Sequence, residues 1–210
     1  MARKTKEDAE LTRQRIITAA REVFAKRGVS HSTMEQIATH AQVTRGAVYW
    51  HFANKIELFQ AMRDQAMRPF IEHIDAAILD PQSEDPLACI EHIFVNTIKT
   101  LEQDCSTRQT YEIMMAKCEY VDEFNDVLQQ LLIYCRVFVA KTQLLYEKAK
   151  QKGQIHPDLD PAALAMDTHM FFGGVIHMWI KDNSNLGYRS QAYDLIRQHI
   201  NLRRVTQISR

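Results

Sequence analysis

A stripe of mainly apolar residues between positions 121 and 149 limits the fold of this chain more than any other feature. Its members recur at alternating spacings of three and four residues: Val121, Phe124, Leu128, Leu131, Cys135, Phe138, Thr142, Leu145 and Ala149. This spacing places them on one face of a long α-helix that ends near Gly153. Six glycines and five prolines in 210 residues are too few for the many tight turns of an all-β fold. The sequence therefore predicts an all-α protein.

Periodicity and capping signals predict the other helices. The expected ranges are 7–27, a helix from the Ser32 cap to about 40, then 45–52, 55–79, 86–103, 107–118, 121–152, 161–182 and a last helix from about 188. Ser32 and Glu35 have the spacing of a capping box for the second helix, and Thr44 and Asp160 are expected N-caps of later ones. Pro69 has no amide donor, so we expect it to kink or break the helix that contains it.

Charge is distributed unevenly along the chain. Residues 1–60 contain ten Lys and Arg against six Asp and Glu, whereas the remainder contains 16 against 20. The first segment is therefore about +4 and the rest about −4, and such an asymmetry suits a polyanionic partner at the N-terminal end.

Several classes of function are not expected from this sequence. The four cysteines form no C-x-x-C pair, and His169 and His177 have no carboxylate or thiolate at coordinating spacing, so no metal or other cofactor is predicted. The apolar run 170–180 is too short to span a membrane, which favours a cytoplasmic protein. Because no catalytic constellation is visible, we predict that the chain is not an enzyme.

Two short helices joined by residues 41–43 and preceded by a longer helix form a helix-turn-helix of the size that reads DNA. The expected organisation is a DNA-binding domain at 1–57 and a larger domain at 58–210. Arg45 stands at the start of the second short helix, where a guanidinium can bond guanine bidentately. Val48 and Phe52 are expected in the core.

The residues of this segment closely resemble the DNA-binding signature of the TetR family of bacterial transcriptional repressors. The resemblance is dense over residues 3–59 and includes the runs 33–38, 43–55 and 57–59. The Tyr-Trp-His-Phe run at 49–52 and the later Lys-Cys-Glu at 117–119 are similar to the multidrug-efflux (acridine-resistance regulator) branch of that family. Beyond residue 60 the resemblance is thin.

This resemblance implies an all-helical homodimer whose paired helix-turn-helix heads bind a palindromic operator. Carried over by position, the DNA-binding residues are Thr33, Thr44, Arg45, Gly46, Tyr49, Trp50, His51 and Lys55, together with Arg3 and Lys4 of the N-terminal arm. Gln42 departs from the family, since relatives usually have glycine in that turn. A left-handed backbone there costs glutamine about 1 kcal/mol.

The resemblance also implies an effector pocket in the larger domain, without indicating which residues line it. Soft and aromatic side chains suit such a pocket, and the candidates are Met67, Phe70, Phe94, Tyr111, Met114, Met115, Phe138 and Phe172. Polar groups within apolar stripes are better candidates because a buried polar group needs a partner, and these are Thr142, Thr168 and His169. The alternatives are ordinary core packing for the first set and neighbouring backbone carbonyls as partners for the second.

The helix expected at 161–182 is apolar nearly all round, so one buried face does not account for it. Its candidate dimer residues are Gly173, Gly174, Val175, Met178 and Trp179. Packing of these residues within one chain is the alternative.

The function predicted from the sequence is a ligand-responsive repressor of a multidrug efflux pump operon, released from DNA by hydrophobic or cationic drugs. Its expected partners are operator DNA, a small hydrophobic effector and a second copy of the chain. Two alternatives remain open at this point: a TetR-like repressor of lipid or other metabolic genes, and a structural nucleoid-binding protein.

Overall fold

A computed structural model describes residues 6–79 and 84–205 of the chain. These residues form α-helices, one π-helical turn and one 3₁₀ turn, and they contain no strand beyond an isolated bridge between Ile155 and Arg204. The predicted all-α fold is confirmed. The α-helices in chain order are α1 (Lys6–Arg27), α2 (Met34–His40), α3 (Arg45–His51), α4 (Lys55–Leu79), α5 (Pro86–Gln103), α6 (Cys105–Glu112), α7 (Asn125–Gln151), α8 (Pro161–Lys181) and α9 (Tyr188–Asn201).

The chain packs into two compact units. Among the described residues, unit 1 comprises 6–67 and 105–130, and unit 2 comprises 68–79, 84–104 and 131–205. Both α4 and α7 contribute residues to each unit. These units are defined by packing within the chain. The expected boundary at residue 57 separates DNA binding from effector binding and stays a prediction.

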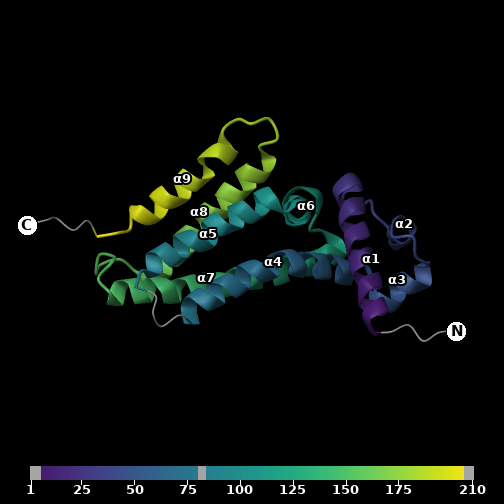
Figure 1. The fold of residues 1–210 in the computed structure, drawn as a ribbon, viewed down its shortest axis with the longest axis horizontal. Coiled ribbons are helices and arrows are strands. Elements are labelled where there is room, and N and C mark those ends of the chain that lie inside the picture. The colour runs from purple at the N-terminus through teal and green to yellow at the C-terminus, as the bar shows by residue number, and fades with distance from the viewer. Residues whose placement is uncertain (1–5, 80–83, 206–210) are drawn as a thin grey trace, which may run out of the picture. The chain divides into compact units, whose positions relative to one another are not determined.

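Unit 1 contains the three helices of the predicted head. The helices α1, α2 and α3 contact one another (Figure 1). Phe24 of α1 and Phe59 of α4 are fully buried with their ring centroids 6.3 Å apart, and Phe124 meets Phe59 edge to face at 5.5 Å. Val48 and Phe52 are buried as predicted, so the inner side of α3 is fixed against this core.

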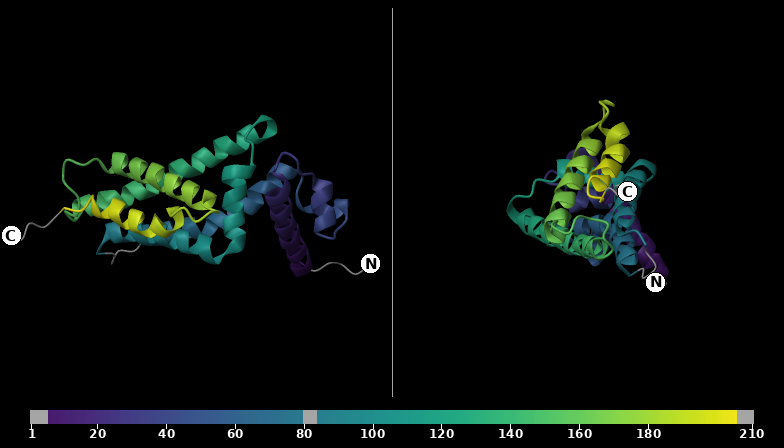
Figure 2. Two further views of the ribbon diagram at one scale, coloured as in Figure 1. Left: turned by 90° about the horizontal axis from the view of Figure 1, so that it is seen from above. Right: turned by 90° about the vertical axis from the view of Figure 1, so that its left-hand side faces the viewer.

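Unit 2 is a helical bundle in which α9 packs against both α5 and α8. Figure 2 shows α8 and α9 running side by side in both views. The largest fully buried side chains here are Trp179 and Tyr146. Polar residues also lie inside the unit, since Thr142 and Thr168 are almost completely buried.

Most of the predicted caps are present, with one shift of register. The Thr44 side chain accepts a hydrogen bond from Ala47 N at 3.1 Å, and Asp160 accepts from two amides at the start of α8. The predicted capping box at Ser32 is wrong by one residue, because Thr33 is the N-cap of α2 and Gln36 is its reciprocal partner. Ser32 is buried and its hydroxyl donates to Gly28 O at 2.6 Å instead.

Pro69 does not break α4, which continues from Lys55 to Leu79. Proline removes one amide donor, but Pro69 is exposed, so the carbonyl that loses its partner can be hydrated. Buried residues lie on both sides of the proline, such as Met62 in unit 1 and Ile74 in unit 2.

The helix expected at 107–118 differs in form. The α-helix α6 ends at Glu112, and residues Ile113–Lys117 form a single π-helical turn. A wider turn of this kind is rare and often occurs at functional sites.

Candidate functional site

The outer side of α3 presents large side chains to solvent. We define the α3 face as Arg45, Gly46, Tyr49 and Trp50, all of which are exposed. Trp50 is 72% exposed and Tyr49 is 43% exposed. The Arg45 guanidinium lies 5.4 Å from the Tyr49 ring centroid, so the two side chains support each other across one helical turn. An exposed tryptophan beside a tyrosine and an arginine is typical of a surface that binds a macromolecule.

Packing within the chain does not explain the glycine in α3. A Cβ atom added at Gly46 would meet only the Thr44 hydroxyl, at 4.0 Å. The space outside this position is therefore open. Glycine lowers helix stability by about 1 kcal/mol relative to alanine, and an open surface at that point lets another backbone approach α3 closely.

The turn between α2 and α3 keeps its standard form despite glutamine at position 42. Gln42 has φ 52°, a left-handed conformation, and Val43 N bonds to Ala38 O at 3.0 Å across the turn. This is the pattern of a Schellman cap, in which glycine usually occupies the left-handed position. The expected strain at Gln42 is therefore present, and α3 still begins at Arg45.

We expect Gln42→Gly to raise the free energy of unfolding by about 0.5 kcal/mol. Removing the Cβ relieves the cost of the left-handed backbone in the folded protein, about 1–2 kcal/mol. Glycine also raises the conformational entropy of the unfolded chain, which offsets about 0.4–1 kcal/mol of this stabilisation. Urea denaturation followed by circular dichroism measures the change. Gln42→Ala serves as the control because alanine keeps the strain, and a glycine variant less stable than the alanine variant would contradict the interpretation.

Lys55 is committed to contacts within the protein. Its ammonium donates to Val29 O at 3.0 Å and Ser32 O at 3.3 Å, and it lies 5.6 Å from the Phe124 ring centroid. The side chain therefore fastens the loop between α1 and α2 to the start of α4. Contact between Lys55 and a DNA phosphate stays a prediction, and two of its three donors already have partners.

The remaining predicted DNA-binding residues have varied surroundings. Thr33 and Thr44 are exposed N-caps, so their side chains also have a structural role. His51 is half-buried with its ring 4.5 Å from that of Trp50 in an edge-on arrangement. Arg3 and Lys4 lie outside the described residues.

A second set of contacts joins the predicted head to residues 117–119 within unit 1. Val29 N donates to Lys117 O at 2.9 Å, and the Lys117 ammonium donates to Ala25 O at 2.7 Å. Ser30 also donates to the Glu119 carboxylate, at 3.4 Å. We call these contacts the head junction. Sequence reasoning did not identify this role, because the partners are about 90 positions apart and lie on no common periodicity.

Unit 2 contains a cluster of four phenylalanine rings contributed by four helices. Phe70 of α4 stacks on Phe138 of α7 at 4.8 Å, and Phe94 of α5 lies 4.0 Å from Phe172 of α8. The ring centroids of Phe94 and Phe138 are 5.9 Å apart, and those of Phe70 and Phe172 are 6.4 Å apart. We call these four residues the aromatic cluster. All four were among the predicted effector-binding residues, and Phe70 is the one that is only half-buried.

The three predicted polar candidates in unit 2 differ in how they are satisfied. Thr142 donates to Phe138 O in its own helix at 3.0 Å, so a backbone carbonyl is its partner. Thr168 is paired with Tyr146 at 2.7 Å. His169 lies 5.7 Å from the Phe138 ring centroid and has no hydrogen bond or ion pair with any residue in the described ranges. Burial lowers the pKa of His169, so its imidazole is neutral at pH 7.

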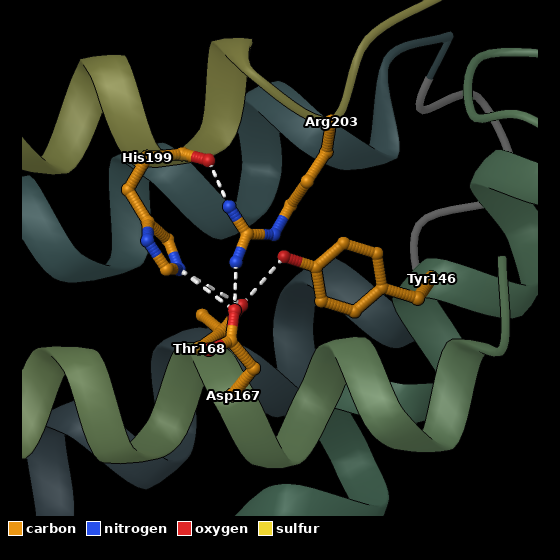
Figure 3. Close-up of polar contacts among 5 residues, drawn as sticks. All are labelled: Tyr146, Asp167, Thr168, His199 and Arg203. Carbon is orange, nitrogen blue, oxygen red and sulfur yellow. Dashed lines mark hydrogen bonds and ion pairs between the residues drawn. The ribbon is translucent and has the colours of Figure 1, made fainter.

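Figure 3 shows a polar network that fastens α9 to α7 and α8. The Thr168 hydroxyl lies 2.7 Å from the Tyr146 hydroxyl and 3.3 Å from His199 Nε2. Arg203 donates to the Asp167 carboxylate and to His199 O. Burial, reinforced by the Arg203 charge, lowers the pKa of His199 to about 4, and burial raises the pKa of Tyr146. The sequence did not predict this network, since its members come from three helices and the turn after α9, and only Thr168 interrupts an apolar stripe.

The other four predicted effector-binding residues belong to unit 1. Tyr111 and Met114 are buried, whereas Met67 and Met115 are half-buried. Met114 also closes the π-helical segment, because its carbonyl accepts a hydrogen bond from the Tyr120 hydroxyl at 2.9 Å. Their role in binding an effector stays a prediction.

The predicted dimer residues divide into an exposed group and one buried residue. Gly173, Gly174 and Met178 are exposed and Val175 is half-buried, and a Cβ added at either glycine would meet nothing within 4 Å. Trp179 is only 2% exposed and lies 4.6 Å from the Arg189 guanidinium, measured to its ring centroid, and its place in a dimer stays a prediction. The indole lies on the inner side of α8, where packing within the chain accounts for it.

Within the described ranges, no group of three His, Cys, Asp or Glu side chains is arranged to hold a metal ion. No helix there is long and apolar enough to cross a membrane. Burial raises the pKa of Cys118 to about 11 and also raises that of Cys135, so both thiols are protonated at pH 7.

Comparison with known proteins gives matches over most of the chain. Residues 16–62 match the N-terminal region of bacterial regulatory proteins of the tetR family, and residues 85–204 match the C-terminal region of MAATS-type transcriptional repressors. The HTH-type transcriptional regulator TtgR of Pseudomonas putida is 36% identical over 183 residues, which cover 86% of this chain and 85% of TtgR. The HTH-type transcriptional repressor BepR of Brucella suis is 32% identical, with 85% of each chain covered.

A solved structure gives the same result. The crystal structure of NalD, the secondary repressor of the MexAB-OprM multidrug efflux pump in Pseudomonas aeruginosa, has a TM-score of 0.80 to this chain. The two sequences are 30% identical, and the match covers 92% of this chain and 96% of NalD.

Proposed function

This chain belongs to the TetR family of bacterial regulatory proteins, and we propose that it is an effector-responsive repressor of a multidrug efflux pump operon. It binds a palindromic operator as a homodimer in the bacterial cytoplasm, and hydrophobic drugs release it. The observation that carries this proposal is the α3 face, an exposed recognition surface with Trp50 at its centre. That surface lies on a helix-turn-helix within the region matched to the family.

The α3 face suits the major groove of DNA. Arg45 at the start of α3 is the base-reading residue, since a guanidinium can donate two hydrogen bonds to guanine O6 and N7. Tyr49 and Trp50 extend the contact to the sugar-phosphate backbone, where a hydroxyl or an indole N–H can donate to phosphate. The open position at Gly46 lets the DNA approach the helix backbone.

Exposed apolar side chains on α8 and α9 support a homodimer. Met166, Met170 and Met178 are exposed on α8, and Leu195 is exposed on the neighbouring α9. Met170 alone is 65% exposed. A second copy of the chain would cover this surface, with the two glycines of α8 permitting close helix packing. Two heads related by a two-fold axis then read half-sites about 34–36 Å apart.

The aromatic cluster is our candidate for the effector site. Flat phenyl rings from four helices bind apolar molecules of varied shape. NalD, which represses a multidrug efflux pump, resembles this chain over nearly its whole length, and this supports a drug as the effector and an efflux operon as the target.

One helix contributes residues to both the head and the aromatic cluster. The helix α4 supplies both Lys55, which fastens the loop between α1 and α2, and Phe70 of the aromatic cluster. Within unit 1 the head junction also holds this loop, through Lys117. An effector shifts the repressor toward release only to the extent that it binds the released conformation more tightly.

A gel-shift experiment tests the proposal with DNA from the region upstream of the protein's own gene. We expect retardation that a hydrophobic drug abolishes. Phe70→Ala should leave DNA binding intact and weaken the response to the drug, because Phe70 is the half-buried edge of the cluster. Phe171→Ala is the matched control, since Phe171 stacks on His199 and is not part of the cluster.

The outcomes separate the remaining alternatives. If a fatty acyl thioester releases the protein from DNA and no drug does, the regulated genes are lipid genes and the efflux operon is ruled out as the target. Retardation of all DNA alike, unaffected by any small molecule, would instead indicate a structural nucleoid protein.

A further inference from the structure

His169 lies beside the aromatic cluster, and its ring nitrogens have no assigned hydrogen-bond partner in the described part of the chain. It lies one helical turn before Phe172 on α8, and its ring packs 5.7 Å from that of Phe138. The side chain is half-buried, and burial is the sole cause that lowers its pKa, with no charge or hydrogen bond contributing. A neutral imidazole has one N–H donor and one nitrogen acceptor. Both atoms are therefore available to a bound molecule.

The threonine hydroxyls near the cluster are already used within the protein. Thr97 donates to Ile93 O at 2.9 Å and Thr142 donates to Phe138 O at 3.0 Å. Thr168 is engaged by Tyr146 and His199. An effector that needs a hydrogen-bond partner beside the rings will consequently find His169 rather than a threonine.

The carboxylates of the four cluster helices in unit 2 are also committed or exposed. Asp75 pairs with Lys141, Asp167 with Arg203 and Glu91 with Arg197. Glu102 accepts from Tyr193 and Glu147 from Gln143, while Glu72 is exposed to solvent. A cationic effector would thus find no unpaired carboxylate to compensate for the hydration that it loses on binding. The cation–π attraction of phenylalanine rings is weak compared with the cost of removing an ammonium group from water.

We infer that His169 is the hydrogen-bonding anchor of the effector site and that it selects neutral aromatic molecules bearing a hydroxyl group over aromatic cations. This inference rests on the proposed function, because it takes the aromatic cluster as the effector site. A hydroxyl on an aromatic ring can donate to the unprotonated imidazole nitrogen while its ring lies among the phenyl groups. Phe70 and His169 are both half-buried and both have their rings against Phe138, so a ligand's ring and its hydroxyl group can be bound by neighbouring side chains. Neutral hydroxylated aromatics are a narrower class of effector than the hydrophobic or cationic drugs expected from the sequence, and they replace that expectation.

Three probes with the same ring system test the inference: 2-naphthol, naphthalene and 2-naphthylmethylammonium. Isothermal titration calorimetry at pH 7 on the full chain measures each affinity. We expect the wild-type protein to bind 2-naphthol five- to tenfold more tightly than naphthalene, the range of one hydrogen bond. The ammonium probe should bind more weakly than both.

Variants at position 169 assign the effect to the imidazole. His169→Phe should lower the affinity for 2-naphthol to that for naphthalene, while His169→Gln keeps a donor and an acceptor and should restore part of the difference. His177→Phe is the matched control, since His177 is also half-buried on α8 and lies two turns away. Its affinities should equal those of the wild-type protein.

The results distinguish failure of this inference from failure of the proposed function. If all three probes bind with similar affinity and position 169 has no effect, His169 is not the anchor but the cluster remains an effector site. Tightest binding of the ammonium probe would likewise overturn the inference. If no probe binds to any variant, both the inference and the cluster as effector site are wrong.

Discussion

Arg45→Ala is expected to weaken binding to the correct operator by about 1–3 kcal/mol per head while leaving binding to random DNA nearly unchanged. Arg45 is exposed at the first turn of α3, with only the Tyr49 ring as a described contact, so its removal should not disturb the fold. A bidentate contact with guanine contributes only when the right base is present. Most of the lost binding free energy should therefore come from poorer discrimination between the operator and random DNA.

Gel-shift titrations of the variant against operator DNA and a scrambled duplex, at several salt concentrations, measure this effect. Arg45→Lys is the matched control, because it keeps the charge but cannot form the two parallel hydrogen bonds of a guanidinium. It should retain binding to random DNA and lose most of the discrimination. Equal losses on the operator and on random DNA for Arg45→Ala would mean that Arg45 contacts phosphate.

The free energy of unfolding is expected to fall by up to about 3 kcal/mol between pH 6.5 and pH 4 through His199 alone. Burial against α8, together with the Arg203 charge, lowers the pKa of His199 from 6.5 to about 4 in the folded protein. Below pH 6.5 the unfolded chain binds a proton on this imidazole, whereas the folded chain does so only near pH 4. The contribution of His199 is therefore fully present above pH 6.5 and is lost as the pH falls toward 4.

Urea denaturation at pH 7.0 and at pH 4.5 tests this prediction. His199→Gln removes the titrating group and keeps a side chain that can reach Thr168, so it should show a much smaller loss of stability at the lower pH. The pKa of His169 is also lowered, and its contribution has the same sign and remains in that variant. The lowered carboxyl pKa values of Asp85 and Asp182 act in a more acidic range, below their ordinary value of 3.8.

His177→Gln is the control for the loss of a histidine, because it removes an imidazole from α8 outside the polar network. This variant should keep the wild-type dependence on pH. An identical loss of stability in the wild-type protein and in His199→Gln would contradict the assignment.

The predictions that succeeded depend on interactions within a few residues. The helices and the caps at Thr44 and Asp160 follow from periodicity and from hydroxyl or carboxylate groups that bond to amides two or three residues away. The left-handed turn at Gln42 is also local, since its hydrogen bonds close between residues 37 and 43. The exposure of Arg45 and Trp50, with Val48 and Phe52 inside, follows from the helical period.

The predictions that failed, and the features that were missed, involve partners far apart in the chain. Ser32 and Thr33 are both acceptable N-caps, and the choice depends on Ser32 being buried with its hydroxyl on Gly28 O. The bonds of the Lys55 ammonium to Val29 O and Ser32 O were missed, and its contact with a DNA phosphate stays a prediction. The burial of Trp179 beside Arg189 was also missed, and its place in a dimer stays a prediction.

An all-α fold of the TetR type, with a recognition helix at about residues 45–52, can be predicted from the amino-acid sequence alone. These properties are local or are carried by short motifs, so they are written in consecutive residues. Which polar groups find a partner on another helix follows only from the way the helices pack. Thr142, Thr168 and His169 look equivalent in the sequence, yet Thr142 bonds to a carbonyl of its own helix, Thr168 bonds to Tyr146 of another helix, and His169 has no hydrogen-bond partner among the described residues. The bond of Thr142 is local, but the surroundings of Thr168 and His169 depend on neighbours from other helices, and no periodicity along one helix specifies them.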